Sequence, residues 1–253
     1  MKVLIISDIH GNWPALRAVL EAEPDVTQII CLGDLVNYGP HPVECVSWAK
    51  EASPIGIFLQ GNHDRALGMD TDPHCSSSYV ALAAATQRVT EELLGHELKE
   101  FLASLNPSVH FRNGQDTCFA CHATPKDPLY HYMPPNSAVS LWESEIIVAQ
   151  HPDYLFFGHT HLPLKNRFRR TLIINPGSVG QPKDGDPRAA YAIWENGEIT
   201  LRRTPYEIEE TIRAYESFGL ESHIRDSLCE VLRTGGNLPA EHYQKPTTQI
   251  THG

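Results

Sequence analysis

The 253-residue sequence predicts an α/β fold in which two mixed β-sheets pack face to face and helices cover them on the outside. In the first half of the chain, short apolar runs alternate with amphipathic segments, a pattern typical of parallel βαβ units. In the second half, one strand pattern follows another, which favours a second sheet over further βαβ units. A hydrophobic content of 41% can bury a sizeable core at this length, and a single domain is the default.

Five short apolar runs, rich in β-branched or aromatic residues, are predicted to be buried strands. Asn12 to Ala22 fits a helix that Asn12 can cap, and His41 to Ala52 fits another. Ser76 to Leu105 is helical in pattern, with Gly95 marking a break into a second helix. The five strand runs are Val3 to Ile6, Gln28 to Leu32, Ile55 to Leu59, Thr117 to Cys121 and Tyr154 to Phe157.

Further strands are predicted before the chain returns to helix. Asn196-Gly197 is a strong signal for a hairpin turn between the last two of them. Two C-terminal helices, Tyr206 to Phe218 and Glu221 to Arg233, follow. We expect one domain over residues 1–235 and a flexible polar tail over 236–253. The further strands lie around Val109, over Leu164 to Arg169, Leu172 to Ile174, Ala189 to Glu195 and Ile199 to Arg203.

The composition is that of a cytoplasmic enzyme. A net charge of −11 and a pI near 5.6 argue against non-specific nucleic-acid binding, which depends on Lys and Arg. The six cysteines show no disulfide spacing and are expected to be buried, reduced thiols. No segment is long enough to span a membrane, and the first apolar run is too short for a signal peptide. The pattern leaves the oligomeric state open.

Each of the five strand runs ends in a residue that can ligate a metal ion. The carboxyl ends of strands in open α/β sheets form one crevice, so these side chains are expected to meet. Any one of them alone would be interpreted as a turn residue or helix cap, but their joint occurrence predicts a two-metal site. The residues, in blocks, are Asp8 and His10, Asp34, Asn62 with His63 and Asp64, His122, and His159 with His161.

Carboxylates, imidazoles and a side-chain amide, without thiolates, favour divalent ions such as Mn, Fe, Zn, Co or Ni, with manganese first among them here. Two such ions, roughly 3.5–4 Å apart, can clamp the oxygens of a phosphoryl transfer and make hydroxide from water near neutral pH. Asp34 is the candidate bridge, because the preceding Gly33 lets the backbone come close.

The blocks and their order resemble the signature of the calcineurin-like metallophosphoesterases, over about the first 200 residues. The resemblance implies a four-layer αββα sandwich. It implies that the first ion binds Asp8, His10, Asp34 and His161. It implies that the second ion binds Asp34, Asn62, His122 and His159. A metal-bridging hydroxide would attack phosphorus, Asn62 and the ions would stabilise charge, and His63 would protonate the leaving group.

Within the family, the tract Asn175 to Pro182 resembles the small bacterial and archaeal phosphodiesterases. Protein phosphatases carry Asp and Arg where this chain has Asn37 and Tyr38. Without that guanidinium, a small phosphodiester is the expected substrate. Phosphomonoesterase, protein phosphatase or dinucleoside polyphosphate hydrolase activity are the alternatives. A non-catalytic metal-site scaffold or regulatory protein is disfavoured, because every ligand position is intact.

Three loops are expected to set substrate choice: residues 37–42, 65–78 and 124–137. The aromatic side chains of the third loop, with Tyr38, form either a wall for a nucleobase or aryl group or, by default, a plug that pins the loop to the body. Asp64 and Asn37 are both candidates to orient His63. Cations that could reach a phosphate, each a surface charge by default, are Arg65, Lys126, Lys183 and Arg188.

Overall fold

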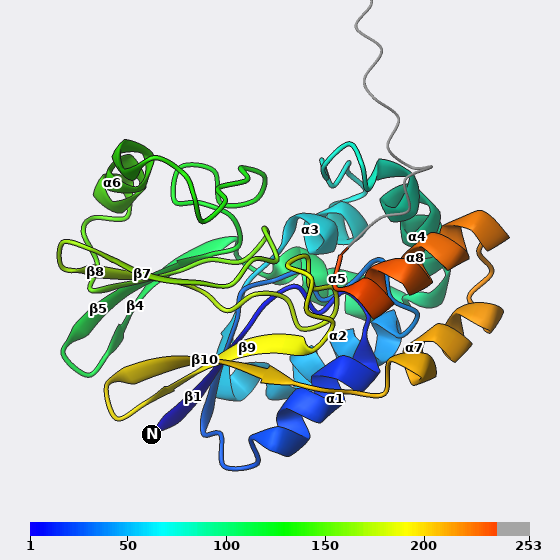
Figure 1. Ribbon diagram of the computed structural model, residues 1–253, viewed down its shortest axis with the longest axis horizontal. Helices are drawn as coiled ribbons and strands as arrows, with labels where there is room; N and C mark the ends of the chain where they lie inside the picture. The colour runs from blue at the N-terminus through cyan, green and yellow to red at the C-terminus, as the bar shows by residue number, and fades with distance from the viewer. Residues whose placement is uncertain (237–253) are drawn as a thin grey trace, which may run out of the picture.

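The structure is a computed structural model that describes residues 1–236, and it contains two mixed five-stranded sheets packed face to face (Figure 1). Helices lie on the outer sides of the sheets, as the sequence predicts. The tail expected over 236–253 lies, apart from Gly236, outside the described residues. No helix within residues 1–236 is both long and apolar enough to cross a membrane.

The first sheet has the strand order β10-β9-β1-β2-β3. Its parallel part contains β1 (Lys2–Ile6), β2 (Gln28–Cys31) and β3 (Gly56–Phe58). The hairpin of β9 (Ala189–Glu195) and β10 (Glu198–Thr204) adds to the free side of β1, antiparallel to it. The predicted turn is confirmed, since Asn196 and Gly197 both have positive φ, 52° and 79°, as a type I′ turn requires.

The second sheet has the strand order β4-β5-β6-β8-β7. Three central strands, β5, β6 and β8, run parallel, and β4 and β7 flank them antiparallel. The parallel strands bring the ends of β5 and β6 to one edge, as β1 to β3 do in the first sheet. The five strands are β4 (Ser108–Asn113), β5 (Asp116–Cys121), β6 (Tyr154–Phe156), β7 (Leu164–Phe168) and β8 (Thr171–Asn175).

Strand β1 shows how one segment serves two cores. Val3 and Ile5 point into the layer between the sheets, where they join Phe156 and Trp194. Their alternating neighbours, such as Leu4, point to the opposite face and pack under the helices that cover the first sheet. Because both faces are buried, the strand reads as a continuous apolar run, and its register places the chain that follows it at the edge of the sheet.

The predicted helices form close to their expected bounds. Asn12 caps α1 by accepting a hydrogen bond from the backbone N–H of Ala15 at 3.3 Å. Gly95 separates α4 from α5, as expected, although α4 begins at Val80, four residues after Ser76. The helices are α1 (Trp13–Ala22), α2 (Pro42–Ala52), α4 (Val80–Leu93), α5 (His96–Ser104), α7 (Ile208–Ala214) and α8 (Ser222–Thr234).

Two helices, α3 (Asn62–Met69) and α6 (Val139–Val148), were not predicted from the sequence. Helix α3 begins with polar residues of the site and contains Gly68, so its pattern resembles a loop. A Cβ on Gly68 would come within 2.7 Å of the backbone nitrogen of Ala103, so the glycine allows α3 and α5 to pack closely. Helix α6 exposes apolar side chains as well as burying them, which hides its amphipathic period.

All six cysteines are free thiols, and five of them are buried, in agreement with the sequence expectation. Cys118 and Cys121 lie on the same strand but on its opposite faces: Cys118 packs between the sheets and Cys121 packs under α6. Strand geometry therefore separates this pair and gives each thiol the role of a small apolar side chain.

Candidate metal centre

The ligand-type side chains meet where strands of both sheets end, and they form two groups. All six of the carboxylate and imidazole residues are at most 2% exposed. Such burial without positive partners would be costly for carboxylates, so the grouping itself points to bound cations. The first group contains Asp8, His10 and His161, and the second contains Asp34, His122 and His159.

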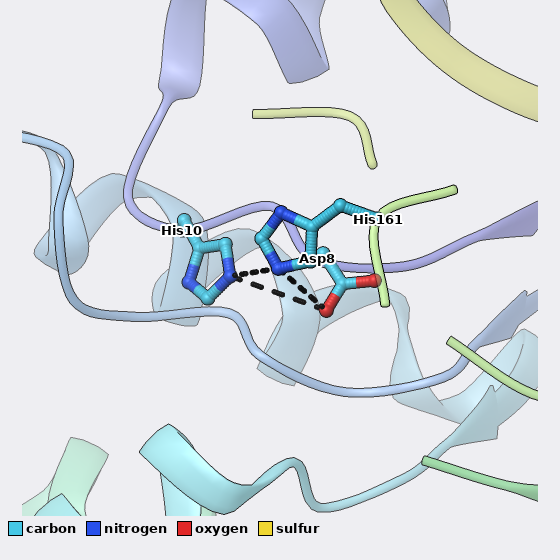
Figure 2. Close-up of side chains that lie close together, drawn as sticks. All are labelled: Asp8, His10 and His161. Carbon is cyan, nitrogen blue, oxygen red and sulfur yellow. Dashed lines mark hydrogen bonds and ion pairs between the residues drawn. The ribbon is translucent and has the colours of Figure 1, made fainter. Parts of the chain in front are cut away.

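In the first group three ligand atoms face one point (Figure 2). Nε2 of His10 lies 3.1 Å from Nε2 of His161. Oδ1 of Asp8 lies 3.5 Å from Nε2 of His161 and 4.0 Å from Nε2 of His10. Oδ1 of Asp8 is buried and has no hydrogen-bond partner, although it could accept two.

The second group is built in the same way around Nε2 of His122. This atom lies 2.9 Å from Oδ1 of Asn62, 3.2 Å from Nδ1 of His159 and 3.3 Å from Oδ2 of Asp34. The amide of Asn62 is oriented by its Nδ2, which donates to the carbonyl oxygen of Pro73 at 2.7 Å. The carbonyl oxygen of Asn62, a good ligand for a divalent ion, is therefore the atom turned toward His122.

Asp34 lies between the two groups. Its Oδ2 is 3.3 Å from Nε2 of His122 in the second group and 3.7 Å from Nε2 of His10 in the first. Its Oδ1 accepts a hydrogen bond from the backbone N–H of His63 at 2.9 Å. One carboxylate thus faces both groups, which is the placement that a bridging ligand needs.

The backbone at these ligands is strained. Asp8, His10, Asp34, His159 and His161 all have φ between 48° and 63°, in the left-handed region that non-glycine residues seldom occupy. Such residues cost about 1–3 kcal/mol each and persist where the surrounding structure holds them. Here the strain turns each side chain from its strand end toward the common centre.

Each imidazole of the two groups uses one nitrogen to bind a backbone carbonyl, which leaves the lone pair of the other nitrogen facing the centre. His10 and His161 therefore point two lone pairs at each other across 3.1 Å, without a proton between them. A cation beside them removes this repulsion, and so the donor set fits a metal ion. The carbonyl bonds are His10 Nδ1 to Val36 at 3.0 Å, His122 Nδ1 to Leu32 at 2.8 Å, His161 Nδ1 to Gln181 at 2.5 Å and His159 Nε2 to Tyr130 at 3.2 Å.

Burial keeps His10, His159 and His161 neutral, as ligands must be. At His122, burial is outweighed by the charge of Asp34 together with its hydrogen bond and smaller contributions, which raise the pKa to about 9. Burial lowers the pKa of His10 to about 3 and that of His161 well below its usual value. Burial raises the pKa of Asp34, but the charge of His122 and the hydrogen bond that His122 makes to Asp34 help to hold the pKa well below its usual range. Burial also raises the pKa of Asp8 to about 7. Asp34 is thus the firmest negative charge of the centre.

Asp64, one of the two candidates to orient His63, instead braces the backbone. Its Oδ2 accepts from the N–H groups of Asp34 at 2.7 Å and Gly61 at 3.0 Å, and its Oδ1 accepts from Leu35 at 2.8 Å. These bonds tie the start of α3 to the loop that carries Asp34. The hydrogen bonds that the structure gives Asp64 all come from backbone N–H groups, and none comes from the His63 ring.

Asn37 is the residue that holds His63. Its Nδ2 donates to Nδ1 of His63 at 2.9 Å and to the carbonyl oxygen of Ala83 at 3.3 Å. Its Oδ1 accepts from the N–H of Tyr38 at 3.1 Å and from the hydroxyl of Thr86. These partners leave no ambiguity in the amide orientation, so Nδ1 of His63 is an acceptor and the ring carries its proton on Nε2.

Tyr38 does not form a wall for a substrate, contrary to one sequence-based interpretation. It is 3% exposed, and its ring packs on those of His10 and His63, with centroids 4.9 and 5.0 Å away. In the 124–137 loop, Tyr132 lies over the ring of His159, with centroids 3.9 Å apart, and remains 37% exposed. The loop thus pins a ligand of the second group and still presents one aromatic edge to solvent.

The tract over residues 175–182 is part of the site and does more than carry the chain past it. The hydroxyl of Ser178 and the N–H of Gly180 both donate to the carbonyl oxygen of Asp8, at 2.7 and 3.0 Å. A Cβ on Gly180 would lie 1.8 Å from the carbonyl oxygen of Ile9, so only glycine permits this approach. Apart from the resemblance of the tract itself, no sequence pattern pointed to these contacts.

Comparison with known proteins agrees with this geometry. The family model described as the calcineurin-like phosphoesterase superfamily domain matches residues 1–197. An uncharacterised protein of Methanocaldococcus jannaschii is 32% identical over 236 residues, which cover 85% of this chain and 90% of that protein. The phosphodiesterase YfcE of Escherichia coli K12 is 25% identical over 211 residues, which cover 79% of this chain and 91% of YfcE.

Solved structures show the same fold. A metallophosphoesterase from Sphaerobacter thermophilus superposes with a TM-score of 0.76 at 32% identity, covering 93% of this chain and 99% of the other. A hypothetical protein from Pyrococcus horikoshii superposes with a TM-score of 0.80 at 22% identity, covering 94% of this chain and 99% of the other. The second likeness concerns the fold alone.

Proposed function

The chain belongs to the calcineurin-like phosphoesterase superfamily, and on this premise we propose that it is a dinuclear-metal-dependent enzyme that hydrolyses a phosphodiester. The observation that carries the proposal is the position of Asp34, whose Oδ2 faces an imidazole of each ligand group, at 3.7 and 3.3 Å. A single-metal or purely structural site does not require a carboxylate between two sets of ligands. The similarity to YfcE, which is named a phosphodiesterase, supports the reaction class.

Two divalent ions fit the donor set, with manganese as the first candidate and Fe, Ni, Zn and Co as the others. Bound there, the ions would lower the pKa of water toward neutrality and neutralise charge on the phosphoryl oxygens. The residues that would hold the first ion are Asp8, His10, Asp34 and His161. The residues that would hold the second are Asp34, Asn62, His122 and His159.

His63 is the proposed proton donor to the leaving group. Its ring is buried beside the first group, with its centroid 5.3 Å from that of His10, and its proton lies on Nε2 because Asn37 donates to Nδ1. Burial lowers the pKa of His63 to about 4, so the free enzyme holds a neutral ring that can donate a hydrogen bond. To protonate the leaving group and return to the neutral ring, His63 must first take up a second proton at Nδ1, in place of the hydrogen bond from Asn37. An anionic phosphoryl group beside the ring favours this imidazolium form and so favours proton transfer.

A diester is the proposed substrate class, because the site has no guanidinium in the place where protein phosphatases have one. Tyr38 fills that position and is buried behind the ligands. A bidentate Arg suits the dianionic phosphoryl group of a monoester, whereas a diester carries one charge fewer. The absence of this Arg therefore weakens substrate binding less for a diester than for a monoester.

A substrate panel tests the function. Metal-stripped protein is restored separately with Mn, Ni, Zn, Fe or Mg, and kcat/KM is measured for an aryl phosphodiester and the matching monoester. We expect activity only with metal, and a higher kcat/KM for the diester. Strong monoesterase activity with negligible diesterase activity would contradict the proposed substrate class. If the metal-loaded protein hydrolyses no substrate in the panel, the alternative of a non-catalytic scaffold is favoured.

The six free thiols support a proposal for the compartment as well. Five are buried, and none is paired in a disulfide. Thiols in this state are typical of proteins kept under reducing conditions, and we infer that the enzyme acts in the cytoplasm.

A further inference from the structure

Of the four cations that the sequence offers as candidates to reach a phosphate, three are engaged elsewhere. Arg188 pairs with Asp186 at 2.6 Å. Lys126 donates to the hydroxyl of Ser144 at 2.6 Å, and Arg65 donates to Oε1 of Gln60 at 3.3 Å. Each of these three charges therefore already has a partner among the described residues.

Lys183 differs from the other three. Within residues 1–236, its Nζ has no carboxylate or hydrogen-bond acceptor and lies over the ring of Tyr79, 4.2 Å from the centroid. That ring packs edge-on against Tyr38, which in turn contacts the rings of His10 and His63. The ammonium group is therefore separated from the metal centre by one pair of aromatic side chains.

The charge of Lys183 acts on the metal centre. Burial lowers the pKa of Lys183 to about 8, and the charges of Asp8 and Asp34 oppose this shift. Burial lowers the pKa of His161, and the charge of Lys183 is the next contribution in the same direction. At His63, burial lowers the pKa most and the charge of Asp34 opposes it. The charge of Lys183 is the next contribution, and it lowers the pKa. At neutral pH the ammonium group, held over the ring of Tyr79, is mostly charged.

The backbone on both sides of Lys183 is held by hydrogen bonds and packing. Two residues earlier, the carbonyl oxygen of Gln181 accepts the Nδ1–H of His161. On the other side, the N–H of Gly185 donates to the carbonyl oxygen of Gly235 at 2.9 Å. A Cβ on Gly236, whose φ is +113°, would lie 2.4 Å from Cα of Lys183, so the chain after α8 is packed against this position.

We propose that Lys183 is the substrate-binding cation of the site, and that its Nζ leaves the ring of Tyr79 to bind an anionic phosphoryl oxygen of the substrate. This proposal rests on the proposed function and deepens it. The face of a ring is a weaker partner for an ammonium group than a phosphoryl oxygen is, so the exchange favours binding. A lysine offers one compact charge without the fork of a guanidinium, which suits the single negative charge of a diester.

Inorganic phosphate is the binding probe. Its Kd is measured by titration calorimetry on the metal-loaded full-length protein, together with the affinity for the metal and the KM for an aryl phosphodiester. The variants are Lys183→Met, which keeps the length and removes the charge, and Lys183→Arg, which keeps the charge. The matched control is Lys50→Met, because Lys50 pairs with Glu97 on the surface of α2 and α5.

We expect Lys183→Met to weaken phosphate binding and raise KM by about 10- to 100-fold, with a smaller change in kcat. Metal affinity should stay the same or increase, because a positive charge beside the ions has been removed. Lys183→Arg should recover most of the phosphate affinity, and Lys50→Met should change neither affinity.

Unchanged phosphate affinity in Lys183→Met would overturn the proposal. So would a parallel loss of metal affinity, since that indicates a distorted site and not a lost anion contact. Phosphate binding needs no turnover, so the titration tests the role of Lys183 even if no ester in the substrate panel is hydrolysed. If no ester is hydrolysed but Lys183→Met still weakens phosphate binding, the proposed enzyme function is refuted and the proposed anion site is supported.

Discussion

Asn37 donates a hydrogen bond from Nδ2 to Nδ1 of His63 across 2.9 Å, and this bond determines which nitrogen of the ring carries the proton. A carboxylate at position 37 would accept a proton from Nδ1 and stabilise the imidazolium. The amide does the reverse, because its donor faces Nδ1 and opposes protonation there. The residue beside His63 thus sets how readily the ring can act as an acid.

Replacing Asn37 with Asp should raise the pKa of His63 and increase activity on substrates with poor leaving groups. The new carboxylate would keep the donors Tyr38 N–H and Thr86 Oγ1–H and would gain Nδ1–H of His63. We expect the ratio of kcat/KM for an alkyl diester to that for a nitrophenyl diester to rise by about tenfold, as one unit of pKa allows. An unchanged ratio, with the metals retained, would show that position 37 does not control the proton.

His63 and Asn62 are adjacent, but their substitution should reduce activity in different ways. His63→Ala should keep both metals and lose roughly 10²–10⁴-fold in activity on a substrate with a poor leaving group. With nitrophenoxide, which hardly needs a proton, the loss should be much smaller. Asn62→Ala should weaken the second metal and slow both substrates alike. A His63→Ala protein with an empty metal site, or with a defect independent of leaving-group pKa, would rule out the acid role.

Metal analysis of the purified protein should find about two transition-metal ions per chain, the number that a dinuclear centre holds. Asp34→Asn should disturb both, because Oδ2 of Asp34 faces both groups at 3.7 and 3.3 Å. Elemental analysis after dialysis gives the count, and Asp64→Asn is an informative comparison because Asp64 binds only backbone N–H groups. If Asp34→Asn loses only one ion and keeps normal activity, Asp34 does not bridge the two ions.

Glu23, at the end of α1, makes a pH-dependent contribution to the stability of the fold. It is 4% exposed, and it contacts Lys2 at 2.8 Å, Arg202 at 2.6 Å and Tyr191 at 2.9 Å. Burial raises its pKa, but these three partners outweigh burial and hold the pKa below its usual value of 4.5. The stabilisation is therefore complete above pH 4.5 and is lost as the pH falls through the lowered pKa.

Glu23→Gln should accordingly reduce the free energy of unfolding by about 1–3 kcal/mol at pH 7, and by less at pH values below the lowered pKa. Urea unfolding at the two pH values measures the difference. Glu21→Gln, two residues earlier and 72% exposed in its side chain, should change stability by no more than about 0.5 kcal/mol. A Glu23→Gln effect that is equal at both pH values would show that the carboxylate charge is not responsible.

Local sequence patterns were sufficient to predict which residue types reach the centre and from which strands. Asp8, Asp34 and His122 each follow a recognisable apolar run, and parallel strands bring their carboxyl ends to one edge whatever the details of packing. Helices with a clear apolar face were predictable for the same local reason. Helices α3 and α6 were not, because polar ligands in one and exposed apolar residues in the other hide the period.

The way in which neighbouring polar groups share their hydrogen bonds follows from the packing of the folded chain and not from local patterns. The sequence offers both Asn37 and Asp64 as partners for His63, and the packing gives Asp64 to the backbone and Asn37 to the ring. It likewise buries Tyr38 behind the ligands and places the ammonium group of Lys183 over the ring of Tyr79. These choices depend on the direction of single side chains across residues distant in sequence, and no local pattern of residue types carries that information.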